Sequence, residues 1–292
     1  MFKSDLRVLQ MTLFLLIFLF TTRVHSQGFK LLDVSYAYYP DAEISEAQNG
    51  AESSISELNV AINLPKVFNE GDAVLINGLS YGLVKPTIQN SSSEEGDNLH
   101  LISYTLSYVK KVGDKSRLIT TFRPSISSQL NSSLTGDDFL FLGSAMIRKK
   151  VDDRKSWSAG LVYTSRFGEP IVLPILGYSV KGERFIFDVT LPRSIKGLAY
   201  NESKRLEYGL MVAVDGSQFN LNTSDDLPFD NVRFSRENLG PTVEYGMNEH
   251  VFFNLFTGFI ANRVYDFTSS SQDDLDFGLE NGFFASFGIS LQ

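Results

Sequence analysis

An alternation of apolar and polar side chains with a period of two runs from residue 28 to the end of the 292-residue chain. Its clearest stretch spans residues 102–108, where isoleucine, tyrosine and leucine alternate with serine and threonine. Neighbouring side chains of a β-strand point to opposite faces, so this period predicts strands with one apolar and one polar face. No apolar run after residue 26 is long enough for a spanning helix. The pattern predicts an all-β chain and excludes a helical membrane protein.

The length of the predicted strands favours a barrel that crosses a membrane. Many alternating stretches reach about ten residues, which matches the ~9–11 residues of a transmembrane strand rather than the ~5–6 of an average soluble strand. Tyrosine and phenylalanine lie near the ends of the apolar faces, as in the aromatic girdles of membrane barrels. We therefore expect a transmembrane antiparallel up-and-down β-barrel whose apolar face meets lipid. A secreted soluble β-sandwich with a binding or adhesion role is the alternative, because the pattern does not fix which way the apolar face points.

Short turns and long polar loops follow one another along the chain. Short turns are expected at residues 111–115, 151–155, 181–183 and 247–249, and long loops at residues 40–53, 86–98, 127–137 and 269–276. Outer-membrane barrels have short turns on the periplasmic side and longer loops outside. At roughly 22 residues for each strand with its connection, the chain predicts about 12 strands. Residues 215–236 fit a loop, a plug or a further strand.

Residues 1–26 have the parts of a cleaved secretory signal peptide. Lys3 and Arg7 give a positive start, and residues 8–20 form an apolar stretch that is shorter than a spanning helix. Val24 and Ser26 fit the small-residue rule for cleavage before residue 27. We expect the mature part, residues 27–292, to be a single barrel domain in the outer membrane. Its expected partners are outer-membrane lipid and the machinery that assembles barrels.

Several parts of the chain together resemble small outer-membrane β-barrel proteins of unknown function from Gram-negative bacteria. These parts are the serine–glutamine junction at 26–27, the tyrosine-rich strands, the stretch 181–200 and the closing residues 281–292. The resemblance covers the mature chain and implies a membrane barrel. One departure is the last residue, because many such proteins end in an aromatic residue recognised during assembly, whereas this chain ends in Gln292.

Composition excludes several kinds of site. The chain has no cysteine, which excludes disulfides, cysteine-based metal centres and a cysteine nucleophile. A net charge of −8 argues against binding of nucleic acid, which needs an excess of lysine and arginine. Aspartate-rich loops at 137–138, 225–226 and 273–276 lack the residue spacing of a calcium-binding loop. We therefore expect no metal and no cofactor.

Histidine-based catalysis is not expected either. After residue 26 the chain contains His100 and His250 as its histidines, and Ser103 would face away from His100 on a strand. A nucleophile and its base must lie within hydrogen-bond reach of each other. The chain is therefore not expected to be an enzyme, and an outer-membrane hydrolase is the third alternative.

Charged residues on the polar strand faces are the remaining candidates for function. If the apolar faces meet lipid, these side chains project into the lumen, since a charge facing lipid at mid-depth costs about 2–4 kcal/mol for arginine. The lumen-facing candidates are Arg117, Arg123, Arg184, Asp188, Glu207 and Glu244. They predict either a filled, salt-bridged interior, as in a closed structural barrel whose outer loops bind a ligand, or the selective zone of a narrow pore for a small solute or ion. The sequence leaves the oligomeric state open.

Overall fold

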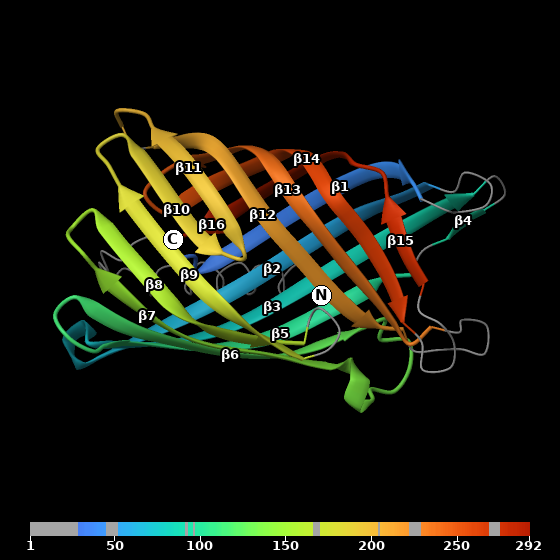
Figure 1. Cartoon of the computed structure of the whole chain (residues 1–292), viewed down its shortest axis with the longest axis horizontal. Helices are drawn as coiled ribbons and strands as arrows, with labels where there is room; N and C mark the ends of the chain where they lie inside the picture. The colour runs from blue at the N-terminus through green and yellow to red at the C-terminus, as the bar shows by residue number, and fades with distance from the viewer. Residues whose placement is uncertain are drawn as a thin grey trace, which may run out of the picture.

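The computed structural model describes residues 29–44, 52–90, 93–95, 97–165, 170–203, 205–221, 229–268 and 275–292. The predicted signal peptide, residues 1–26, lies outside this part. Within it, one continuous antiparallel sheet closes into a barrel (Figure 1). No helix of the described residues is long and apolar enough to cross a membrane.

Fourteen strands form the ring among the described residues, each paired with its neighbours along the chain. They are β1 (Leu32–Glu43), β2 (Glu52–Phe68), β3 (Ala73–Asn90), β5 (Leu99–Lys111), β6 (Ser116–Ser128), β7 (Phe139–Lys150), β8 (Lys155–Thr164), β9 (Ile171–Lys181), β10 (Phe185–Leu191), β11 (Ser194–Tyr200), β12 (Leu206–Asn220), β13 (Asn231–Gly246), β14 (Val251–Thr268) and β16 (Gly282–Leu291). The ring closes between β1 and β16, where Leu32 lies opposite Leu291.

Four short elements complete the described part of the chain. Beyond the ring, strand β4 (Ser93–Glu95) pairs with β3, and β15 (Leu275–Leu279) pairs with β14. Two short 3-10 helices, η1 (Asn69–Gly71) and η2 (Gly136–Asp138), lie in connections.

The predicted antiparallel all-β barrel is confirmed, but the predicted number of about 12 strands is wrong. The sequence interpretation missed β11, which follows β10 after a connection of only two residues. Of residues 215–236, the described positions 215–220 belong to the end of the long strand β12 and positions 231–236 to the start of β13, whereas 222–228 lie outside the described residues. A fixed allowance of residues per strand fails here, since connections at one end of the barrel are much shorter than at the other.

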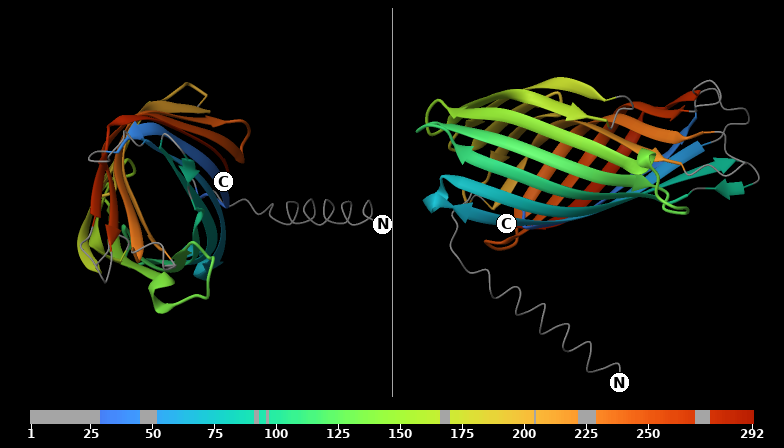
Figure 2. Two further views of the ribbon diagram at one scale, coloured as in Figure 1. Left: turned by 90° about the vertical axis from the view of Figure 1, so that its right-hand side faces the viewer. Right: turned by 90° about the horizontal axis from the view of Figure 1, so that it is seen from below.

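The two ends of the barrel differ. One end, called the turn end here, carries the short connections 69–72, 112–115, 151–154, 182–184, 201–205 and 247–250, together with the start of β1 and the end of β16. The other, called the loop end, carries the connections after β1, β3, β6, β8, β10, β12 and β14, with β4 and β15 at the right in Figure 1. Figure 2, left, views the barrel from the loop end and shows its oval outline.

Large apolar side chains face outward around the whole ring. Tyr104, Tyr108 and Phe187 point outward with 44%, 37% and 41% of their surface exposed, and Leu210 is 62% exposed. A soluble protein rarely exposes apolar surface on this scale. The described strands form one closed sheet rather than the two stacked sheets of the sandwich alternative. The outward face is therefore suited to hydrocarbon.

Candidate functional site in the lumen

A cavity of about 320 Å³ lies inside the barrel, with polar and small side chains along its wall. It is lined by Ser35, Ala37, Tyr39, Glu57, Asn59, Ser80, Gly82, Val84, Leu101, Ser103, Arg123, Asp215, Gly216, Ser217, Arg236 and Ser286. On β1, β2, β3 and β5 the lining residues recur at every second position, as expected for the inward face of a strand. The polar faces of these strands therefore build the chamber.

An ion pair crosses the lumen at this cavity. Arg236 on β13 donates from Nη2 to both carboxylate oxygens of Glu57 on β2, at 2.6 and 2.7 Å. Around the ring these two strands are separated by β14, β16 and β1, so the contact is a chord across the interior. The two side chains keep only 10% and 14% of their surface exposed. Burial at this level makes the pair strong once formed and costly to break.

Other groups hold the Arg236 guanidinium in place. It lies 3.9 Å from the centre of the Tyr39 ring, within the range of a cation–π contact. Asp215 lies directly opposite Arg236 on the neighbouring strand and accepts a hydrogen bond from Asn238 at 3.3 Å. Two carboxylates and one aromatic face therefore surround a single cation.

A layer of apolar side chains fills the lumen between this ion pair and the loop end. We call it the aromatic layer, and its members are Tyr39, Ile55, Phe219, Phe234, Ile260, Tyr265 and Phe284, each at most 7% exposed. The Phe234 ring meets Tyr265 edge to face at 4.7 Å and Phe219 at 6.0 Å. This layer departs from the polar lumen that the sequence predicted. It narrows the lumen between the chamber and the loop end.

The barrel narrows there because β6 and β12 meet across the gap left by shorter strands. Ser128 and Asn220 form a parallel bridge, and the Ser127 hydroxyl donates to the carbonyl of Gln218. Five strands, β7 to β11, separate β6 from β12 around the ring. Beyond the ends of those strands the remaining wall encloses a smaller interior, which side chains can fill.

Asp138 of η2 anchors this junction from the loop side. It is fully buried and accepts a hydrogen bond from the Asn220 amide at 3.0 Å and one from the Thr135 backbone at 2.5 Å. Burial alone would raise the pKa of the Asp138 carboxyl, but hydrogen bonds from Ser128, Thr135 and Asn220 outweigh it and bring the pKa below its usual value. The carboxylate is therefore the form that holds the junction.

The structure brings one of the six predicted lumen residues to the cavity. Arg123 lines it, and its Nε donates to Thr105 at 2.9 Å. Arg117 lies on the same face of β6 but at the turn end, opposite Arg148. Arg184 lies in a turn, where its pair with Glu202 at 3.4 Å is exposed.

The other three predicted residues lie nearer the turn end. Glu207 and Glu244 are direct cross-strand neighbours on β12 and β13. Asp188 on β10 lies opposite Lys196 on β11. None of the three lines the cavity.

Sequence reasoning missed Glu57, Asp215 and Arg236, which form the charged centre of the cavity. Asp215 and Arg236 fell in the segment whose structure the sequence left open. Glu57 does lie on the polar face of a predicted strand, and that alternation was the available signal. Its pairing with Arg236 depends on a chord across the ring, which strand periodicity does not reveal.

The histidines do not form a nucleophilic site with serine. The imidazole Nδ1 of His100 lies 2.9 Å from the hydroxyl of Tyr81, and both residues lie on the outward-facing side of their strands. His250 is exposed in the turn after β13. Within the described ranges, no group of three or more histidine, aspartate or glutamate side chains is arranged to hold a metal ion.

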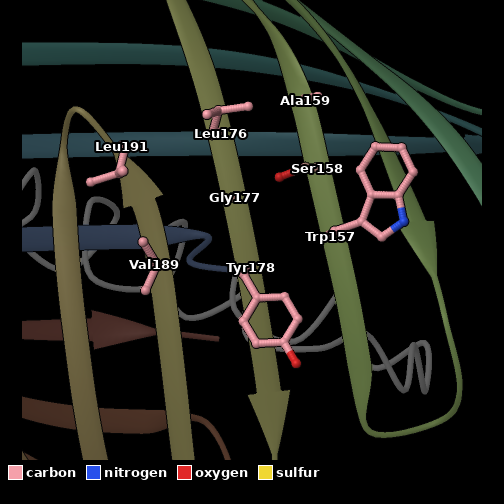
Figure 3. Close-up of a pocket in the computed structure, with 8 residues that line it drawn as sticks. All are labelled: Trp157, Ser158, Ala159, Leu176, Gly177, Tyr178, Val189 and Leu191. Atoms are coloured by element: carbon pink, nitrogen blue, oxygen red, sulfur yellow. The ribbon is translucent and has the colours of Figure 1, made fainter.

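A second hollow, of about 330 Å³, lies on the outward face of β8, β9 and β10 (Figure 3). Trp157 and Tyr178 are direct cross-strand neighbours there, and Leu176, Val189 and Leu191 complete its apolar wall. Aromatic residues near the end of a strand are typical of the interface between lipid and water. We interpret this hollow as lipid-facing surface.

The sequence model of one family covers residues 22–291. The chain belongs to the family DUF6268, a domain of unknown function. The predicted resemblance to a barrel family of unknown function is confirmed. No curated protein matches the chain.

Solved outer-membrane barrels resemble this DUF6268 chain in fold. The TodX monoaromatic hydrocarbon channel, as its deltaS2 mutant, is 10% identical over 89% of this chain and 88% of its own, with a TM-score of 0.47. The COG4313 outer membrane channel from Pseudomonas putida F1 is 10% identical over 91% and 97%, with a TM-score of 0.40. The translocator domain of the autotransporter NalP from Neisseria meningitidis is 14% identical over 99% and 97%, with a TM-score of 0.39. The similarity concerns the general barrel fold.

Proposed function

We propose that this DUF6268 chain is an outer-membrane barrel that passes small polar solutes or ions through a narrow lumen. The observation that carries the proposal is a polar chamber inside a ring whose outward face is apolar. An outward face of this kind is stable when lipid surrounds it. A polar chamber inside the ring favours water and polar solutes. Export by residues 1–26 would deliver the chain to that membrane, with the loop end outside.

The Arg236–Glu57 pair is the proposed constriction of this pore. Charged groups that face a narrow passage select ions by sign and size. Arg236, Glu57, Asp215 and Arg123 place charges of both signs at one level of the lumen. A solute that crosses the lumen would have to pass both this charged level and the aromatic layer. We therefore expect a channel with low conductance.

The test is electrical recording of the purified full-length chain in planar lipid bilayers. We expect discrete steps of small, constant size that differ between potassium chloride and the salt of a large organic cation. Detergent alone, and protein unfolded by heating, serve as controls. Current traces that match the detergent control at both polarities would contradict a pore and favour the closed barrel whose outer loops bind a ligand.

A further inference from the structure

Two side chains of opposite charge at the lumen cavity have no ion-pair partner among the described residues. Arg123 on β6 and Asp215 on β12 both line the cavity. Arg123 donates from Nε to the Thr105 hydroxyl at 2.9 Å, and Asp215 accepts a hydrogen bond from the Asn238 amide at 3.3 Å. The ion pairs of the described chain include neither Arg123 nor Asp215. The cavity therefore presents one guanidinium and one carboxylate to a ligand.

The other two charged residues of the cavity neutralise each other. Glu57 accepts hydrogen bonds with both of its carboxylate oxygens from the guanidinium of Arg236. Asp215 lies opposite Arg236 on the neighbouring strand, but the ion pair that Arg236 forms is the one with Glu57. The charges that remain available in the cavity are thus one positive charge and one negative charge.

Arg123 and Asp215 reach the cavity from different walls at a similar height of the barrel. Strands β6 and β12 run parallel where they meet, at the bridge between Ser128 and Asn220. Arg123 and Asp215 each lie five positions before that bridge. At ~3.3 Å per residue, both are therefore roughly 16 Å from the junction along their strands. Five strands separate β6 from β12 on the shorter way around the ring, so the two charges face the cavity from separate sides.

The cavity has room for a small organic molecule. Its volume of about 320 Å³ lies at the lower end of the ~300–1,000 Å³ that ligand pockets have. Small side chains leave this space open, and those of Ser80, Ser217 and Ser286 carry hydroxyl groups that can donate or accept a hydrogen bond. Such a wall accepts polar molecules of any charge, so the two unpaired charged groups determine which charges a ligand must carry.

We propose that the cavity binds a small zwitterion whose ammonium and carboxylate groups lie at opposite ends of the molecule, such as an ω-amino acid or a short peptide. Arg123 binds the carboxylate and Asp215 binds the ammonium group. A simple anion or cation leaves one of the two protein charges without a partner, whereas a zwitterion neutralises both and loses its translational freedom only once. The inference rests on the proposed role of the lumen as a solute path and names the class of solute.

The test is titration calorimetry of the folded full chain in detergent micelles, which measures binding whether or not the barrel conducts. The probe is the five-carbon ω-amino acid δ-aminovalerate. Valerate and pentylammonium are comparisons of similar length that carry one charge each, and protein-free micelles give the blank. We expect δ-aminovalerate to bind about tenfold more tightly than either comparison, since each of them lacks one charge-assisted contact.

Two variants assign the charges of the ligand to their partners. Arg123→Gln is expected to make δ-aminovalerate and pentylammonium bind equally, and Asp215→Asn is expected to make δ-aminovalerate and valerate bind equally. The matched controls are Arg117→Gln, on the same face of β6, and Asp188→Asn, on β10. Neither of these two residues lines the cavity, so both control variants should keep the tenfold preference. A purely structural effect of a substitution would weaken the binding of all three probes alike.

Heat-modifiable mobility in gels shows that each preparation has folded. Equal affinity of the unaltered chain for the three probes, or no binding of δ-aminovalerate, would overturn the inference. A preference that persists in both Arg123→Gln and Asp215→Asn would also overturn it. Bilayer recordings of the same preparations report on the pore separately. Conductance without a preference for the zwitterion rejects this inference alone, whereas the preference without conductance supports the binding site and rejects the pore.

Discussion

Replacement of Arg236 by alanine is expected to raise the single-channel conductance several-fold and to lower the free energy of unfolding by about 3–5 kcal/mol. The Arg236–Glu57 pair crosses the lumen, so its loss removes an obstacle from the passage. The loss in stability arises because Glu57 would remain almost buried without its partner. Planar bilayer recordings measure the first effect. Urea unfolding in vesicles, followed by the fluorescence of the single tryptophan, Trp157, measures the second.

Two further variants test whether loss of the buried ion pair causes these effects. Arg154→Ala removes an exposed pair with Glu183, so it should change the free energy of unfolding by less than about 1 kcal/mol and leave the conductance unchanged. The double variant Arg236→Met, Glu57→Leu removes both charges and should recover most of the lost stability, since an apolar pair often replaces a buried ion pair at no cost. An Arg236→Ala barrel with unchanged conductance and unchanged stability would show that the chord does not constrict the lumen.

Replacement of Phe219 by alanine is expected to open the aromatic layer. Phe219 is fully buried, and its ring packs against Phe234. Truncation of a buried phenylalanine costs about 3–5 kcal/mol because a cavity remains. That cavity would lie in the lumen toward the loop end, so we expect a higher conductance together with the lower stability.

Phe283→Ala is the matched control for this prediction. Phe283 lies on β16 with 71% of its surface exposed, and its truncation leaves no enclosed cavity. We expect a much smaller loss of stability and the wild-type conductance. If Phe219→Ala destabilises the barrel but conducts like the wild type, the aromatic layer is packing and does not block the passage.

Periodicity predicted the strands well because each strand must present one face to lipid and the other to the lumen. Tyr104, Tyr108 and Phe187 point outward for this reason. The same rule failed to reveal β11, since it has only seven residues and follows β10 after just Pro192 and Arg193. The number of strands depends on how long each connection is, and an estimate from chain length uses only an average connection.

The sequence predicted less of the charged centre, for a different physical reason. Arg123 could be placed on an inward face by alternation within its own strand. The contact between Glu57 and Arg236 joins residues 179 positions apart and depends on which strands face each other across the closed ring. The aromatic layer depends in turn on the β6–β12 junction, which exists only because β10 and β11 are short. These features come from closure of the barrel, and no local pattern encodes them.

The central claim is that the apolar strand face meets lipid and the polar face meets the lumen. Single cysteines test this claim most directly because the natural chain contains none. A fluorophore on Leu210→Cys, outward on β12, should be quenched by a lipid-soluble quencher and protected from aqueous iodide. A fluorophore on Ser217→Cys, at the cavity on the same strand, should respond in the opposite way. If the Leu210→Cys label in vesicles is quenched by iodide and not from the lipid, the apolar face does not meet hydrocarbon and the account is wrong.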